Sequence, residues 1–129
     1  MTKAALLDQD YLRVNYHQAG FSYLLPEILE LFRGQATIYL KAIEQHLMQG
    51  NLHELAQEAH TLKGAAGSVG AAALAQIAQD LEETAPDSDV TAVALQVDSL
   101  REITDRTDAA IAAELARLAA DTDDALDLI

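Results

Sequence analysis

The stretch 59-AHTLKGAAGSVGAA-72 decides how this chain folds. It has the composition of a helix, yet it holds a histidine, a lysine and three glycines, Gly64, Gly67 and Gly70. A glycine inside a helix costs about 1 kcal/mol relative to alanine. Several of them beside one histidine therefore need a reason other than helix formation.

An apolar seam runs through this stretch and sets the direction of its side chains. Its members recur at spacings of three and four: Leu52, Leu55, Ala59, Leu62, Ala66 and Val69. At about 100° per residue, His60 lies about 130° from the centre of the seam and points to solvent, while Lys63 lies nearer the boundary. His53, Ala56, Gln57, Gly64 and Gly67 fall on the side of His60. We predict an exposed imidazole in cleared space that a bulky partner approaches.

The rest of the chain also has helical periodicity. We expect a short helix over 6–19, closed by Gly20, with Asp8 or Asp10 at its start. The next helix carries Pro26 in its first turn, with Ser22 or a neighbour as cap, and ends at Gly50-Asn51. Two more helices follow over about 52–69 and 71–84. After the loop 84-TAPDSD-89, Asp89 begins a final helix of about 30 residues.

These elements predict an all-α protein. Its architecture is an antiparallel up-down-up-down four-helix bundle with an additional N-terminal covering helix. We place one domain over 1–120 and an acidic, frayed tail over 121–129.

Composition excludes several classes of protein. The chain has no cysteine, and no stretch approaches the roughly 20 apolar residues of a membrane helix. The N-terminus lacks the apolar segment of a secretory signal, so we expect a cytoplasmic protein without membrane insertion. The net charge is −13, with 3 basic and 14 acidic residues from position 80 onward. Nucleic-acid binding is therefore disfavoured, and the acidic half is interpreted as a solvated face and tail, with docking as the alternative.

Metal binding and enzymatic catalysis are also disfavoured. His46, His53 and His60 are spaced by seven, but Gly50-Asn51 interrupts the helix between the first two. The Glu-x-x-His pairs of bundle metal sites are absent from the sequence. It also lacks a nucleophile elbow, a Walker loop and a dinucleotide-binding motif.

The stretch 60-HTLKGAAGSVG-70 resembles the signature of histidine-containing phosphotransfer (HPt) domains, H-x-L-K-G with a glycine six positions later. The matching residues are His60, Leu62, Lys63, Gly64 and Gly70, with Gly67 at a position that favours a small residue. The likeness is greatest to bacterial HPt modules of hybrid sensor kinases. With the bundle pattern, it extends over about residues 8–118.

The resemblance implies that His60 carries a phosphoryl group, accepted from the phospho-aspartate of one receiver domain and passed to the aspartate of another. It implies response-regulator receivers and a hybrid sensor histidine kinase as partners, no cofactor or ATP-dependent kinase activity here, and magnesium on the receiver. Lys63 would stabilise phosphoryl charge, and Gly64 would leave room for the phosphoryl group. Family alignment places Glu82 near His60 to orient the imidazole, with Gln79 as a second candidate.

On the exposed face, His53, Ala56, Gln57, Gly67 and Gln79 are the predicted partner contacts. Gly67 would permit close approach, whereas Gly70 is expected only to end the helix. We expect a monomer, and the initial Met with its own covering helix favours a free protein. The alternatives are a degenerate HPt-like module that docks without transferring phosphate, and a bundle that binds a metal or cofactor.

Overall fold

The computed structural model describes the backbone of residues 4–127 and the side chains of residues 4–121. Over this part of the chain the secondary structure is helical, and α1 is continued by a π-helical turn, Arg13–His17. Two 3-10 turns, Ser22–Leu24 and Ala85–Asp87, precede α2 and α5. The α-helices are α1 (Gln9–Leu12), α2 (Leu25–Gln49), α3 (Leu52–Ser68), α4 (Ala72–Thr84) and α5 (Val90–Asp127).

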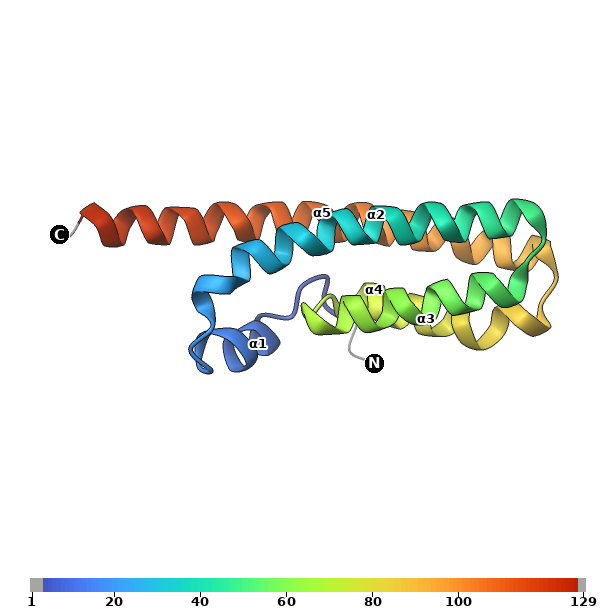
Figure 1. Cartoon of the computed structure of the whole chain (residues 1–129), viewed down its shortest axis with the longest axis horizontal. Helices are drawn as coiled ribbons and strands as arrows, with labels where there is room; N and C mark the ends of the chain where they lie inside the picture. The colour runs from blue at the N-terminus through green and yellow to red at the C-terminus, as the bar shows by residue number, and fades with distance from the viewer. Residues whose placement is uncertain (1–3, 128–129) are drawn as a thin grey trace.

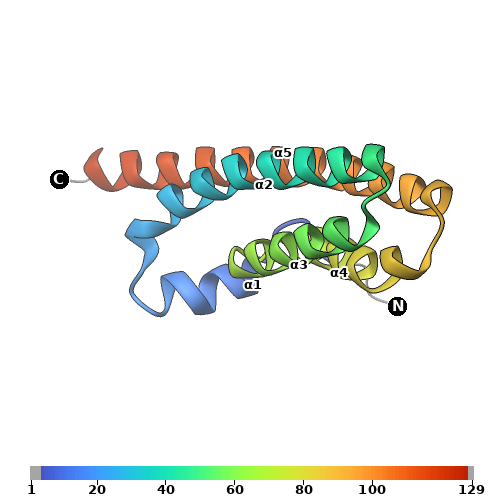
Figure 2. The ribbon, with the colours of Figure 1, turned by 45° about the vertical axis from the view of Figure 1, so that its right-hand side comes forward.

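The four long helices form the predicted antiparallel bundle (Figure 1). α3 packs against α2 and α4, and α5 packs against the same two helices, so α3 and α5 lie on opposite corners. α1 lies beside the C-terminal end of α3 in both views (Figures 1 and 2). The four-helix architecture with an N-terminal helix is thus confirmed.

The caps and turns at the starts and ends of the helices agree with the sequence-based predictions at most positions. The Tyr11 amide donates to the Asp8 carboxylate at 3.1 Å, and the Ala92 amide donates to that of Asp89 at 2.8 Å. Gly50 ends α2 in the left-handed conformation, with φ 73°. Of the expected positions near the start of α2, Ser22 or a neighbour, it is Leu24 that occupies the N-cap, without a side-chain hydrogen bond, and Ser22 lies in the preceding 3-10 turn.

The core is built from the apolar faces of the long helices. Leu55, Ala59, Leu62 and Ala66 of α3 are fully buried, which confirms the central seam. On α5, Thr104 and Thr107 are also buried, and each hydroxyl donates to the carbonyl four residues earlier at 2.7 Å. These two threonines therefore lie in the core without leaving an unsatisfied hydroxyl.

The N-terminal segment is hydrogen-bonded to the turn between α3 and α4. The Asp8 amide donates to the Gly70 carbonyl at 2.8 Å, and the hydroxyls of Tyr11 and Tyr16 donate to the Ser68 carbonyl at 3.3 and 2.8 Å. Gly70 has φ 74°, and a Cβ there would lie 3.0 Å from Tyr11 Cδ1. The expectation that Gly70 only ends the helix is therefore incomplete, because its missing side chain also admits the N-terminal helix.

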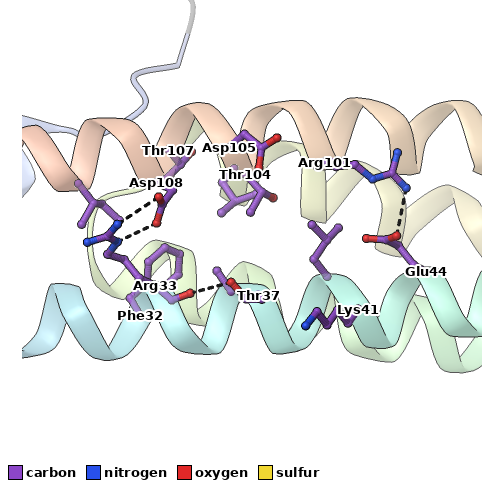
Figure 3. Close-up of a pocket in the computed structure, with 14 residues that line it drawn as sticks. Phe32, Arg33, Thr37, Lys41, Glu44, Arg101, Thr104, Asp105, Thr107 and Asp108 are labelled. Atoms are coloured by element: carbon purple, nitrogen blue, oxygen red, sulfur yellow. Dashed lines mark hydrogen bonds and ion pairs between the residues drawn. The ribbon is translucent and has the colours of Figure 1, made fainter.

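A groove of about 580 Å³ lies between α2 and α5, along the line where they pack. Two ion pairs cross it, as Figure 3 shows. Arg33 binds Asp108 through two hydrogen bonds of 2.7 and 3.2 Å, and Arg101 lies 3.2 Å from Glu44. Two charged side chains of each wall are thus paired across the groove.

α5 runs to Asp127 without a break at residue 120. The proposed division between a domain over 1–120 and a tail over 121–129 therefore remains a prediction, and its last two residues lie outside the described part. No helix in residues 4–127 is long and apolar enough to cross a bilayer.

Candidate functional site

α3 presents His60 to solvent at the middle of the helix. Its side chain is 65% exposed, whereas those of the neighbouring Ala59 and Leu62 are fully buried. The burial of the seam on one side thus forces the imidazole outward, as the helical periodicity predicts.

Glu82 of α4 reaches across to this imidazole. Its Oε1 lies 2.7 Å from His60 Nδ1, and its Oε2 accepts a hydrogen bond of 2.8 Å from Lys63 Nζ. One carboxylate therefore holds both the histidine and the lysine. Because α3 and α4 pack along their lengths, residues 22 positions apart meet at this point.

The electrostatics of the cluster decide which ring nitrogen carries the proton. The hydrogen bond from Lys63 lowers the pKa of Glu82, and the hydrogen bond from His60 acts in the same direction against the opposing effect of burial. An ionised carboxylate only accepts hydrogen bonds, so His60 Nδ1 must be the donor. In the neutral imidazole, Nε2 is then unprotonated and its lone pair is available.

The glycines beside His60 leave the surface of α3 open. Gly64 and Gly67 are both exposed, and a Cβ at either position would meet no atom within 4 Å. The protein's own packing therefore does not require glycine at these positions. Gly70 differs, because its environment inside the fold demands glycine.

A shallow hollow of about 400 Å³ lies next to the imidazole, between α3 and α4. It is lined by His53, Ala56, Gln57, His60, Thr61 and Glu82. His53 and Gln57 were predicted to lie beside His60, and they do. Thr61 was missed in the sequence, although its place directly after the histidine on an exposed helix puts it at the same rim.

Two predicted positions need correction. Ala56 is 7% exposed, so it is covered by its neighbours and is not an exposed residue of the face. It forms the floor of the hollow. Gln79 does not orient the imidazole, because its amide donates to Glu83 Oε1 at 3.0 Å and Glu82 occupies the position beside His60.

The three histidines spaced by seven do not form one site. His46 lies 4.0 Å from Glu58, whereas His53 and His60 line the hollow that contains Glu82. Among the residues that the structure describes, no group of three histidine or acidic side chains has an arrangement suited to a metal ion.

Comparisons with known proteins agree with this geometry. The family model described as "Hpt domain" matches residues 27–122. Among solved structures, the chain is similar to the crystal structure of histidine-containing phosphotransfer protein B (HptB) from Pseudomonas aeruginosa PAO1. The TM-score is 0.79 and the identity 23%, with 88% of this chain and 97% of that chain covered. No curated protein sequence matches the chain.

Proposed function

The chain belongs to the Hpt domain family, and from this premise we propose that His60 accepts a phosphoryl group from the phospho-aspartate of one receiver domain and passes it to the aspartate of another. Membership makes the protein a phosphocarrier of phosphorelay signalling and not a kinase. The direction of transfer and the residues that perform it are the proposal. The observation that carries it is the exposed His60, whose Nδ1 is held by Glu82.

The transfer step uses the free nitrogen of the imidazole. The Nε2 lone pair attacks the phosphorus of the phospho-aspartate, the N–P bond forms, and the bond between phosphorus and the aspartate oxygen breaks. The aspartate leaves as a carboxylate with the bonding electron pair. Positive charge develops on the ring, and the Glu82 carboxylate beside Nδ1–H stabilises it. Transfer to the second receiver reverses these bond changes.

Lys63 is the cation available for the phosphoryl oxygens. It lies one turn beyond His60, and its ammonium is bound to Glu82 at 2.8 Å. We propose that it turns toward the incoming phosphoryl group, because an ammonium binds phosphoryl oxygens through strong charge-assisted hydrogen bonds. Phosphoryl transfer depends mainly on positioning and charge stabilisation, and this cluster supplies both.

The open surface at Gly64 and Gly67 completes the proposed site. A side chain at Gly64 would project where the phosphoryl group and the receiver loops approach, one turn from His60. Magnesium belongs to the receiver in this proposal, and a hybrid sensor histidine kinase is the proposed source of phosphate. The cytoplasmic location and the monomeric state remain predictions.

The test is a transfer assay with purified receiver domains. A receiver phosphorylated on its aspartate is mixed with the protein, and acid-labile, base-stable phosphate is followed and mapped to the peptide that contains His60. We expect transfer with at least one receiver and no labelling by ATP alone. Binding to receivers without any transfer would instead establish the degenerate docking module.

A further inference from the structure

We propose that the outer face of α2 pairs with the same face of a second copy of this chain, in an antiparallel contact with a two-fold axis at Gly34. The outer face is the exposed strip formed by Glu27, Leu31, Gly34, Ile38 and Lys41. The monomer expected from the sequence is then the dilute state of a protein that self-associates weakly. The inference goes beyond the proposed function, because the transfer step uses α3 and α4.

Two large apolar side chains stand in the middle of this face. Leu31 and Ile38 are 62% and 65% exposed, and at about 100° per residue they lie within about 20° of each other on the helix. The buried side chains of α2 lie on the opposite side, about 100–160° from Leu31. Gly34 lies about one turn from both, and a Cβ there would meet no atom within 4 Å. The packing of a single copy therefore explains neither the exposed side chains nor the glycine.

The charged residues of the face are the ones that α2 leaves unpaired. α2 has five Asp, Glu, Lys and Arg residues, and three of them are bound within the fold by the ion pairs Arg33–Asp108, Arg33–Glu30 and Arg101–Glu44. The other two are Glu27 and Lys41, and neither has an ion-pair partner within residues 4–121, whose side chains the structure describes. Figure 3 shows Lys41 beside the two pairs that cross the groove. Single exposed apolar residues are common on protein surfaces, whereas an unpaired anion and cation beside them favour a partner of matching charge.

The spacing of these residues matches a two-fold axis at Gly34. Leu31 and Ile38 lie three positions before it and four after it, and Glu27 and Lys41 lie seven positions before and after. Rotation about this axis places Leu31 against Ile38 of the partner subunit. It also brings Glu27 to Lys41 of the partner subunit, because both charges lie on the Gly34 side of the apolar pair, about 40° and 80° from Leu31. A two-fold contact requires such self-complementarity, which identifies the partner as a second copy.

Little of the net charge of −13, which makes two copies repel, lies on this side of the molecule. α2 carries two basic and three acidic residues, against 3 and 14 from position 80 onward. On the flank toward α5, Asp105 shares the groove with Lys41, and the other acidic residues of the groove are paired. On the flank toward α3, Glu58 faces His46 beyond the end of the outer face, and Glu54 lies one turn nearer the start of α3. Two copies therefore approach through α2 with less repulsion than through α5.

The contact is small, so we expect weak association. From Glu27 to Lys41 the helix rises about 21 Å, and one helix face per copy over this length belongs to the class of interfaces below about 1,200 Å². We expect a dissociation constant between about 1 µM and 1 mM, at the weak end of the affinity scale.

Sedimentation velocity over a range of protein concentrations that spans these values measures the association. Ile38→Glu places a carboxylate in the middle of the contact, at a side chain that is 65% exposed, so unfolding is not a concern. We expect this variant to associate at least about tenfold more weakly. Leu95→Glu is the matched control, because it makes the same kind of change at an apolar residue of α5 that is 66% exposed. It should associate like the wild type.

A charge exchange tests the identity of the partner. Glu27→Lys and Lys41→Glu should each weaken the association by roughly three- to tenfold, because like charges then face each other across the axis. The double variant restores the opposite pairs and should recover most of the wild-type affinity. Such recovery is expected only where the two residues meet between copies.

A single cysteine tests the position of the axis, since the chain has none of its own. Gly34→Cys brings two thiols together and should oxidise readily to a disulfide-linked dimer. Gln45→Cys is the control, because this residue is also exposed on α2 but its two copies would lie about 33 Å apart. It should oxidise to a dimer far more slowly.

A protein that stays monomeric up to about 1 mM would overturn the inference. So would equal weakening by Ile38→Glu and Leu95→Glu, a double charge variant no better than the single ones, or equal rates of disulfide formation at positions 34 and 45. Phosphate transfer is assayed at concentrations where the protein is monomeric, so none of these outcomes bears on it. The inference and the proposed function therefore fail separately.

Discussion

The groove between α2 and α5 and the hollow beside His60 differ in how their charged side chains are paired. In the groove between α2 and α5, each arginine meets an acidic residue across the gap, Arg33 with Asp108 and Arg101 with Glu44 (Figure 3). Beside His60, one carboxylate is shared by a lysine and an imidazole, and the second ring nitrogen stays free. The two arginines of the larger hollow are thus paired within the fold, whereas the smaller hollow presents an exposed imidazole to solvent. Size alone would have selected the groove and not the proposed site.

The largest expected effect is at His60. His60→Gln should remain folded, because the side chain is 65% exposed, and it should lose all acceptance of phosphate from a phosphorylated receiver. Labelling by the receiver and the melting temperature, measured on the same preparation, check this. Acid-labile phosphate on the variant would direct attention to His53, the next histidine along the same face.

The second-largest effect is expected at Gly64. A substitution there distinguishes two reasons for the glycine: clearance for a partner and a requirement of helix geometry. Gly64→Gln should slow transfer by on the order of 100-fold, because a misplacement near 1 Å at a reacting centre has a cost of that order. Its stability should be unchanged or higher by up to about 1 kcal/mol, since glutamine is the better helix former. Transfer kinetics and thermal unfolding measure the two quantities.

Gly34→Gln is the control for this experiment. Gly34 is also exposed within a helix, and a Cβ there would meet no atom within 4 Å, but it lies on α2 and not on the helix that carries His60. It should show the same gain in stability and normal transfer. Equal rates in the two variants would mean that Gly64 does not clear space for transfer.

The sequence predicts most of this fold because its signals are local. The seam on α3 follows from the helical period, and the caps at Asp8 and Asp89 follow from side-chain chemistry. Ser22 fails as a cap because the chain enters α2 through a 3-10 turn that periodicity does not reveal. Boundaries of this kind depend on how the preceding segment packs.

The site is less predictable where it depends on contacts between distant segments. A helical wheel places Ala56 about 40° from His60, on the exposed face, but it takes no account of the neighbouring helices that cover this residue. The second constraint on Gly70 comes from Tyr11, far earlier in the chain. Glu82 was expected from family alignment, and its bond to Lys63 becomes visible only when α3 and α4 are placed side by side.

A smaller and pH-dependent effect is expected at Glu82. Its folded-state pKa is lowered, chiefly by the hydrogen bond from Lys63, so its contribution to stability is present above its ordinary value of 4.5 and is lost as the pH falls through the lowered value. Glu82→Gln should therefore lower the melting temperature at pH 7, by an effect of at most about 1 kcal/mol, and the difference should narrow as the pH falls below 4.5. Thermal unfolding as a function of pH measures this difference.

Glu83→Gln is the control, because Glu83 is exposed and accepts its hydrogen bond from the neutral amide of Gln79. A difference at Glu82 that does not narrow as the pH falls would mean that charge is not its cause.

The smallest effect is expected in the groove, and it tests whether the ion pairs there are purely structural. Arg33→Gln, Asp108→Asn and the double variant form a cycle that isolates the coupling between the two side chains. Both partners are partly exposed, with side chains 30% and 50% accessible, so solvent screens their attraction despite the two-bond geometry. The coupling measured by thermal unfolding should be small and should diminish further in high salt.

Phosphate transfer should match the wild type in all three variants, because the pair joins α2 to α5 whereas His60 and Glu82 lie on α3 and α4. A change in transfer rate without a change in stability would show that the two hollows are coupled, and the contrast between a structural groove and a reactive hollow would then no longer hold.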